Sequence, residues 1–116
     1  MTAGPVRDAL ERHGDRYLRR AFTPAEVADC TTGGTVDATR LAARFAAKEA
    51  VKKLLRTDNV TWRSVEIVRH PEGWTGVSLS ACAARTATEQ GVGEIALSFS
   101  HEGDYVSAIA VAEARA

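Results

Sequence analysis

The sequence predicts an α+β domain in which an antiparallel sheet packs with a long helix. Two observations predict this class. Apolar residues recur at helical spacing over the first half of the chain, and they alternate in short runs, separated by turns and one more helix, over the second half. Helices followed by strands in this order are typical of an α+β domain. The 116 residues are enough for one domain, residues 1–116, and too few for two.

The first third of the chain is predicted to be helical. Residues 6–13 and 16–21 carry apolar side chains at helical spacing, and Gly14 interrupts the pattern. The run Thr23-Pro24-Ala25-Glu26 is a strong helix start, because the threonine can cap, the proline suits the first helical position and the glutamate can close a capping box. We expect this third helix to end near Thr31, ahead of a pair of glycines.

The longest helix is expected to begin within residues 36–39 and to end at Leu55, because an apolar stripe with few poor helix formers runs along it. Strand periodicity follows. Residues 65–69 alternate between two faces, a turn at 71–73 comes next, and residues 75–80 form a second strand.

The remaining elements are a helix and a hairpin. Residues 81–90 are predicted to be helical, with Gly91 closing the helix. Residues 94–100 and 105–112 then pair as a hairpin around a turn at 101–104, whose glycine and aspartate suit the backbone of such turns. We expect the strands of the second half to form one antiparallel sheet.

Composition narrows the classes of function. Fifteen basic and fifteen acidic residues give a formal net charge of zero, which argues against a nucleic-acid partner. Cys30 and Cys82 form no CxxC motif, and two reduced cysteines indicate a cytoplasmic protein. No apolar run approaches the roughly 20 residues that span a bilayer, and Met1–Val6 lacks the apolar region of a signal peptide. Much of the apolar content is alanine, so we expect an oligomer that buries additional surface.

A basic ridge follows the long helix. Its members recur at every fourth residue: Arg40, Arg44, Lys48, Lys52 and Arg56. Glu49 lies beside this ridge, with Phe45 and Lys53 as its neighbours one turn away. Such a ridge can bind several phosphates, and a single carboxylate beside it can hold Mg²⁺ against them. The alternative is a solvated amphipathic face with a Glu49–Lys53 pair, and the spacing does not decide between the two.

Ser100 and His101 stand where a predicted strand meets its turn. A histidine there can hydrogen-bond a ligand or act as a base, or it can be an ordinary exposed turn residue. His13 and His70 are interpreted as surface residues.

Several runs resemble holo-acyl-carrier-protein synthases of the 4′-phosphopantetheinyl transferase superfamily. LAARFAAKEAVKK at residues 41–53 resembles the family's signature helix, and ALSFSHEGDYVSAIAVA at 96–112 looks like its closing hairpin. Residues 17–27 are similar to the segment before the signature helix, and residues 62–69 to the first central strand. The match runs in order over nearly the whole chain.

The resemblance implies a 4′-phosphopantetheinyl transferase-like fold and a homotrimer with each active site between two subunits. It implies transfer of the 4′-phosphopantetheine group from coenzyme A to a serine of an apo acyl carrier protein, with Mg²⁺ bridging the pyrophosphate. By position, Glu49 would be the metal ligand. The implied catalytic residues are Glu49, Lys53 and His101, and those implied to bind coenzyme A are Arg44, Lys48, Lys53, Ser100 and His101.

The chain also departs from the family pattern. The family's N-terminal Gly-x-Asp strand supplies a second metal ligand, and aligning Phe22 and Thr23 places that aspartate before Met1. An in-frame Gly-x-Asp upstream of the codon for Met1 is one explanation. The family's Gly-Thr-Gly loop is replaced by residues 56–59, and its Gly-basic-Pro turn by residues 72–76. The carboxylates that could replace the aspartate are Glu66, Glu102 and Asp104.

Three functions therefore remain open. The chain is an active transferase, or a member of the fold whose intersubunit pocket serves another small-molecule reaction or binding, or a non-catalytic subunit that binds a carrier protein. Binding of coenzyme A separates the first from the third, and activity without coenzyme A would indicate the second.

Overall fold

The computed structural model describes residues 1–57 and 59–114. Its elements, in chain order, are α1 (Gly4–His13), α2 (Asp15–Ala21), α3 (Pro24–Asp29), β1 (Thr31–Thr32), β2 (Thr35–Val36), α4 (Ala38–Leu55), the 3₁₀ turn η1 (Trp62–Ser64), β3 (Val65–Arg69), β4 (Thr75–Leu79), α5 (Ala81–Glu89), β5 (Val92–Glu102) and β6 (Tyr105–Ala114). The α+β class predicted from the sequence is confirmed.

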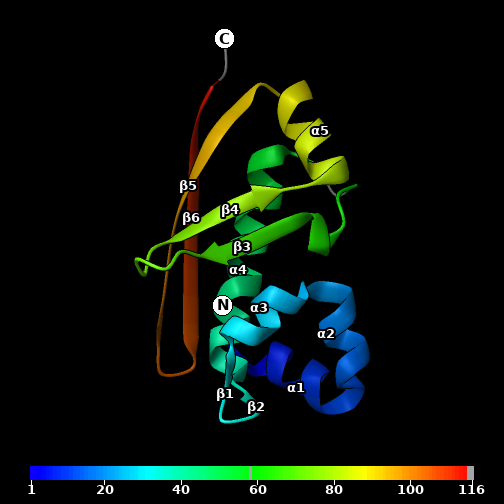
Figure 1. Ribbon diagram of the computed structural model, residues 1–116, viewed down its shortest axis with the longest axis vertical. Coiled ribbons are helices and arrows are strands. Elements are labelled where there is room, and N and C mark those ends of the chain that lie inside the picture. The colour runs from blue at the N-terminus through cyan, green and yellow to red at the C-terminus, as the bar shows by residue number, and fades with distance from the viewer. Residues whose placement is uncertain (58, 115–116) are drawn as a thin grey trace.

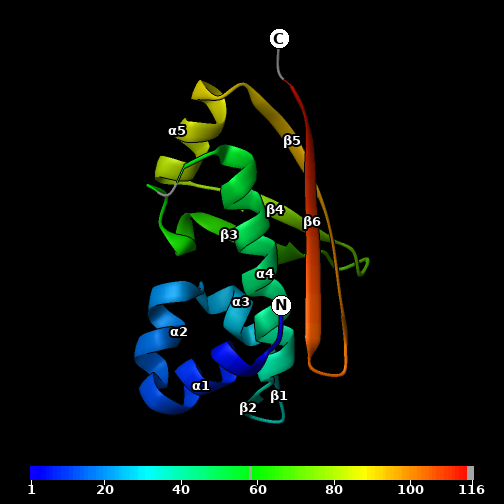
Figure 2. The same cartoon turned by 180° about the vertical axis from the view of Figure 1, so that it is seen from behind.

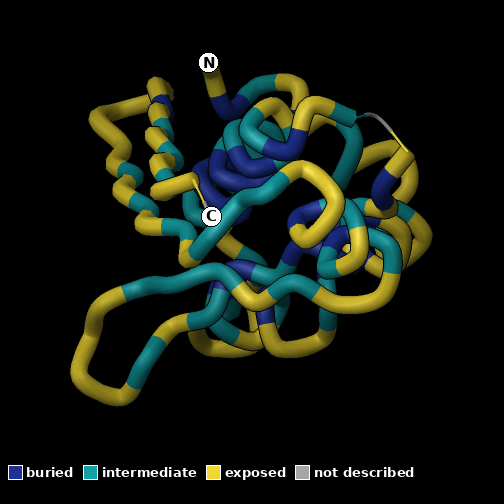
Figure 3. Tube along the Cα trace, turned by 90° about the horizontal axis from the view of Figure 1, so that it is seen from above, coloured by how far each residue is buried: buried dark blue, intermediate teal, exposed yellow. Residues whose placement is uncertain are grey.

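α4 is the central element (Figures 1 and 2). The β5–β6 hairpin follows one side of it, while α1, α3, β3 and α5 contact it elsewhere. Buried residues gather around α4 when the molecule is seen from above (Figure 3). No helix within the described residues is long and apolar enough to cross a membrane.

The core has two clusters, and α4 contributes to both. Its first turns place Leu41 and Ala42 against the buried side chains of α1 and α2. Its later turns place Val51 and Leu55 against β3 and α5. Residues of the β5–β6 hairpin also contribute to both clusters, so α4 and this hairpin together join the two halves of the molecule.

The strands pair antiparallel, as predicted, but they form three separate ribbons instead of one sheet: β1–β2, β3–β4 and β5–β6. The β3–β4 ribbon runs across the direction of β5–β6 in Figure 1, so the edges of the two ribbons do not align for pairing. Sequence alternation identifies strands but contains no information about their relative direction in space. The prediction of a single sheet was wrong for this reason.

Several boundaries also differ from the prediction. α3 ends at Asp29, and β1 and β2 form a small ribbon around Gly33 and Gly34, whose φ angles of 58° and 82° favour glycine. β5 and β6 extend to a turn of two residues, Gly103 and Asp104, so His101, which was predicted to lie in the turn, belongs to β5 together with Ser100.

The first residues of the chain cover the start of β6. The Met1 amino group donates to the Val106 carbonyl at 2.9 Å, the Val106 amide donates to the Met1 carbonyl at 2.8 Å, and the Ala3 amide donates to the Asp104 carbonyl at 2.8 Å. These bonds satisfy part of an edge that would otherwise be open.

The predicted capping box of α3 is confirmed. The Glu26 amide donates to Thr23 Oγ1 at 3.3 Å, and the Thr23 amide donates to Glu26 Oε1 at 2.8 Å. The Thr23 hydroxyl in turn donates to Glu66 on β3. The box therefore does more than begin α3, because it also joins this helix to the β3–β4 ribbon.

Replacing Thr23 by alanine is expected to lower the free energy of unfolding by about 1 kcal/mol, because the helix loses its cap. Urea denaturation measures this change. Thr88→Ala is the matched control, since Thr88 donates only to the Ala84 carbonyl within α5 and is exposed, and its effect should stay within about 0.5 kcal/mol. Equal losses in the two variants would contradict the role of the capping box.

Candidate functional site

The predicted site residues divide between two cavities. The first, the Glu49 cavity, has a volume of about 640 Å³. It is lined by Glu49, Lys52, Lys53, Arg56, Thr57, Asn59 and Trp62. Residues at positions i, i+3 and i+4 of a helix share one face, so α4 presents Glu49, Lys52 and Lys53 here together, and Arg56 follows directly after the end of the helix. Three cations and one carboxylate favour a ligand that carries several negative charges.

Aromatic packing forms one wall of the Glu49 cavity. Lys52 Nζ lies 3.9 Å from the centroid of the Trp62 ring, within the range of a cation–π contact. The Trp62 ring packs on Phe45 with centroids 4.7 Å apart. Trp62 therefore fixes the position of one cation of the cavity.

Tyr17 is a neighbour of Glu49 that the sequence did not identify. Burial, and then the negative charge of Glu49, raise the pKa of Tyr17 to about 12. The phenol therefore keeps its proton even at an alkaline pH at which an ordinary tyrosine, with a pKa of about 10, would lose it. In the sequence, Tyr17 was one apolar position of a short helix, and no pattern linked it to residues on α4.

The second cavity, the His101 cavity, has a volume of about 180 Å³. Its lining comes from α4, the β3–β4 ribbon and β5: Arg40, Ala43, Arg44, Arg69, Gly73, Thr75, Phe99 and His101. Arg40 was predicted only as a member of the basic ridge, and Arg69 was not predicted to bind a ligand. Three guanidinium groups and an imidazole make this cavity strongly attractive to anions.

Arg44 is the buried cation of the His101 cavity. It is 4% exposed, and its guanidinium lies 5.9 Å from the centre of the Phe99 ring. One terminal nitrogen is 3.9 Å from the Asp29 carboxylate, while Nε has no hydrogen-bond partner among the described residues. A buried donor without an acceptor costs free energy, which an anionic oxygen would recover.

α4 separates the two cavities. Arg44 and Glu49 are five residues apart, which turns their side chains by about 140° around the helix axis. Arg44 and Lys53 are also separated by about 13 Å along the axis. The sequence resemblance placed all of these residues around one ligand, whereas a single chain holds them on different sides of one helix.

Ser100 and His101 also diverge. Successive side chains of a strand point to opposite faces, so His101 lies with Phe99 on the α4 side while Ser100 lies on the outer side. Ser100 Oγ is 3.4 Å from Ser107 Oγ on β6. The outer side carries large exposed apolar residues, Tyr105, Ile109 and Val111, at 69%, 66% and 57% exposure.

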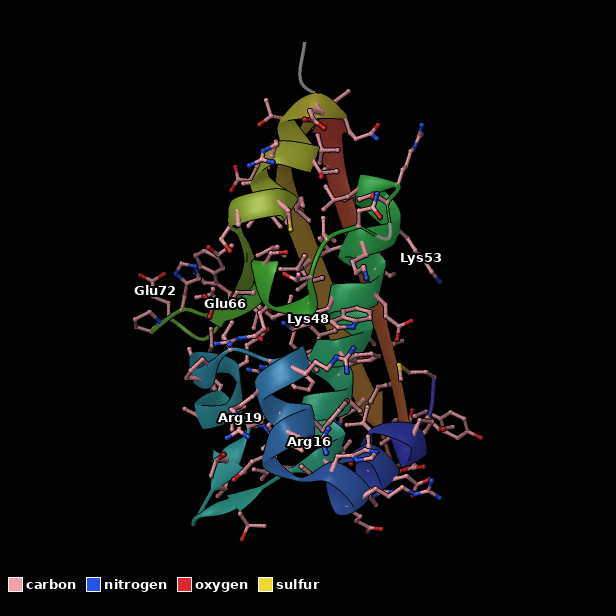
Figure 4. The ribbon with its side chains drawn as sticks, turned by 90° about the vertical axis from the view of Figure 1, so that its right-hand side faces the viewer. Arg16, Arg19, Lys48, Lys53, Glu66 and Glu72 are labelled. Atoms are coloured by element: carbon pink, nitrogen blue, oxygen red, sulfur yellow. The ribbon has the colours of Figure 1, made fainter. Side chains whose placement is uncertain are left out.

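Lys48, which the resemblance implies to bind coenzyme A, points into the interior of this chain. It is fully buried, and its ammonium lies 2.6 Å from the Glu26 carboxylate. Burial lowers the pKa of Lys48, and the Glu26 carboxylate opposes this shift. Figure 4 shows Lys48 within the molecule and Lys53 at its surface. Each step of four residues advances about 40° around a helix, so a ridge at that spacing winds from the surface into the core.

The carboxylates limit the kind of metal site that the chain can form. Within the described residues, no three His, Cys, Asp or Glu side chains gather as metal ligands. Glu66, Glu102 and Asp104 do not line the Glu49 cavity, and Asp104 instead pairs with Arg7 at 3.0 Å. Mg²⁺ often binds one or two carboxylates together with substrate phosphates. Glu49 therefore suits a metal ion that arrives with a phosphorylated ligand.

Comparisons with known proteins agree with the fold. The family model described as "4′-phosphopantetheinyl transferase superfamily" matches residues 2–110. A holo-[acyl-carrier-protein] synthase of Desulforudis audaxviator (strain MP104C) is 47% identical over 109 residues, which cover 92% of this chain and 82% of the relative. The crystal structure of a Neisseria meningitidis holo-[acyl-carrier-protein] synthase superimposes with a TM-score of 0.84 at 28% identity, covering 97% of this chain and 92% of that one. An ACPS–CoA complex of Chronobacterium ammoniagenes superimposes with a TM-score of 0.80 at 25% identity, covering 100% and 93%.

Arg56 holds a left-handed backbone at the end of α4, with φ 58° and ψ 37°. Arg56→Gly is expected to raise the free energy of unfolding by about 1 kcal/mol, because glycine adopts this conformation without a Cβ penalty. The same variant should bind inorganic pyrophosphate more weakly, since the Glu49 cavity loses a cation. Urea denaturation and calorimetric titration measure the two effects, with the exposed Arg85→Ala on α5 as control. If the variant were less stable than the wild type, the Arg56 side chain would stabilise the protein by more than its left-handed backbone conformation destabilises it.

Proposed function

The chain belongs to the 4′-phosphopantetheinyl transferase superfamily, and we propose that it transfers the 4′-phosphopantetheine group of coenzyme A to a serine of an apo acyl carrier protein. The observation that carries this proposal is the Glu49 cavity. It combines one carboxylate with three cations on the helix whose sequence resembles the family's signature. A subunit that only bound a carrier protein would not require this set.

The main requirement of this reaction is the stabilisation of negative charge on the leaving group. The serine oxygen forms a bond to the β-phosphorus of coenzyme A, the bond from that phosphorus to the oxygen of 3′,5′-ADP breaks, and negative charge gathers on the departing oxygen. Lys52 and Lys53 line the cavity in which this charge develops and can donate hydrogen bonds to it.

Glu49 is the carboxylate of the cavity. We assign it two roles, which are to hold the metal ion and to accept the proton of the reacting serine. Mg²⁺ bound there would supply positive charge to the pyrophosphate. The Glu49 carboxylate can also accept a proton from the serine hydroxyl.

The His101 cavity suits the opposite end of coenzyme A, which carries a separate phosphate on the 3′-oxygen of its ribose. Arg44 offers a buried Nε without an acceptor, and Arg40, Arg69 and His101 surround the same space. We assign this phosphate to Arg44 and His101. Ser100 lies on the other side of β5, where it can contact only a ligand that is bound to a neighbouring copy of the chain.

We further assign the complete site to two copies of the chain within a homotrimer. One coenzyme A must meet both cavities, and α4 separates them in a single copy. In a closed ring, the Glu49 cavity of one copy can face the His101 cavity of the next. The exposed apolar side of β6 supports assembly, because Tyr105, Ile109 and Val111 would leave water. The free thiols of Cys30 and Cys82 are compatible with a cytoplasmic enzyme.

Glu49→Gln is expected to lower magnesium-dependent transfer by about 100-fold or more, because it removes the carboxylate and preserves the shape of the side chain. The assay is intact-mass analysis of an apo acyl carrier protein incubated with the protein, coenzyme A and Mg²⁺. Circular dichroism checks that the variant folds, and Glu89→Gln on the exposed end of α5 is the matched control. Unchanged transfer by Glu49→Gln would reject the metal and proton assignments, and no transfer by the wild type would reject the function.

Mixing two inactive variants tests whether the site is shared. Glu49→Gln and His101→Ala, unfolded together and refolded at equal amounts, should recover about one quarter of the wild-type rate, because one quarter of the interfaces pair an intact Glu49 with an intact His101. Each variant refolded alone gives the baseline. A mixture no more active than this baseline would place both residues in the same copy.

A further inference from the structure

A buried ion pair links the elements around the Glu49 cavity. Lys48 Nζ and the Glu26 carboxylate are 2.6 Å apart, and both side chains are fully buried. Both members of the pair also make hydrogen bonds to backbone groups. Glu26 Oε2 accepts the Ile67 amide of β3 at 2.8 Å, and Lys48 donates to the Trp62 carbonyl of η1 at 2.8 Å. The pair therefore holds α3, α4, η1 and β3 together at one point.

Two of these contacts bear directly on the cavity. Lys48 immediately precedes Glu49 on α4, so anchoring Lys48 inward fixes the rotation of the helix and directs Glu49 about 100° away from it. The residue whose carbonyl Lys48 holds is Trp62, which forms the aromatic wall. The Trp62 ring in turn contacts Lys52 Nζ at 3.9 Å. Helix rotation and wall position thus depend on the same ammonium group.

Stability alone is a weak reason for such a pair. Burying two charges carries a large desolvation cost, and apolar residues of similar volume are often as stabilising or more so. An apolar pair could fill this space, but it could hold neither the Trp62 carbonyl nor the Ile67 amide. The ion pair adds hydrogen bonds of fixed direction, and these bonds hold the elements around the cavity in place.

We propose that Glu26 and Lys48 are positioning residues of the transferase site, whose buried ion pair sets the rotation of α4 and the position of Trp62, and thereby the placement of Glu49 and Lys52. The proposal rests on the function proposed above. Neither residue contacts the ligand. They act through the groups that do, and a misplacement of about 1 Å at such groups can cost on the order of 100-fold in rate.

The test replaces the pair by apolar residues. Glu26→Leu with Lys48→Met should remain folded, because the volumes are similar and no buried charge is left alone. We expect kcat for transfer to fall about 100-fold, while KM for coenzyme A stays within about threefold, because the cations that attract the phosphates remain. Val6→Ala, in the core cluster formed with α1 and α2, is the control for a simple loss of stability. A folded double variant with kcat within about twofold of this control would overturn the proposal.

Trp62 provides a second readout that does not depend on activity. The chain has two tryptophans, so the Trp74→Phe background leaves Trp62 as the single reporter. In that background, the double variant should shift Trp62 emission to longer wavelength and expose it to iodide quenching. Unchanged emission would contradict the proposed movement of the wall, even if the wild type transferred nothing. Thus failure of the inference and failure of the function give different results.

Glu26→Gln combined with Lys48→Met keeps the proposal testable if the first double variant does not fold, because this combination also leaves no buried charge alone. Glutamine preserves the shape of the side chain and one carbonyl acceptor, so the Ile67 amide can still be bound. We expect an intermediate kcat, about tenfold below wild type, with KM for coenzyme A nearly unchanged. A kcat equal to that of the wild type would show that the ion pair does not position the site.

Discussion

α4 contributes to both core clusters and to both cavities. Its period of 3.6 residues per turn determines which of its side chains enter the core and which line a cavity. Lys48 enters the interior, and Glu49, the next residue, reaches a surface cavity. Arg44 lies on a different side and meets β5. A small change in the rotation of this helix would therefore alter packing and chemistry together, which is why fixed contacts along its length matter more than its intrinsic helix propensity.

The local elements could be predicted well from the sequence because their signals are local. The capping box at Thr23, the break at Gly14 and the strand at 65–69 each depend on a few neighbouring residues. Burial of charged groups could not be predicted in the same way. A run of cations at every fourth position has the same sequence pattern whether each side chain faces water or is buried. Lys48 is buried against a carboxylate from a helix more than twenty residues away in sequence. The division of strands into three ribbons was missed for the same reason.

The candidate site illustrates how far a motif can be read. The run at 41–53 identified the family and the charged helix, but it did not separate residues that meet a ligand from residues that hold the helix in place. Arg44, Lys48 and Glu49 stand within six positions and have three environments: a half-satisfied buried guanidinium, a paired buried ammonium and a cavity carboxylate. The opposite orientations of Ser100 and His101 were within reach of the sequence, since strand alternation alone separates them. Arg69 and Tyr17 were not, because only the tertiary structure brings them to the cavities.

The placement of the two cavities on different sides of α4 has a consequence for how such a protein would be controlled. If each site is completed by a neighbouring copy, catalysis and assembly share one equilibrium, and a solitary chain is an incomplete enzyme. Specific activity would then depend on how much protein is present: on dilution the rate would fall more steeply than the amount of chain. Synthesis of the protein would act as a threshold, with few copies giving almost no turnover and a modest rise in abundance giving a disproportionate gain.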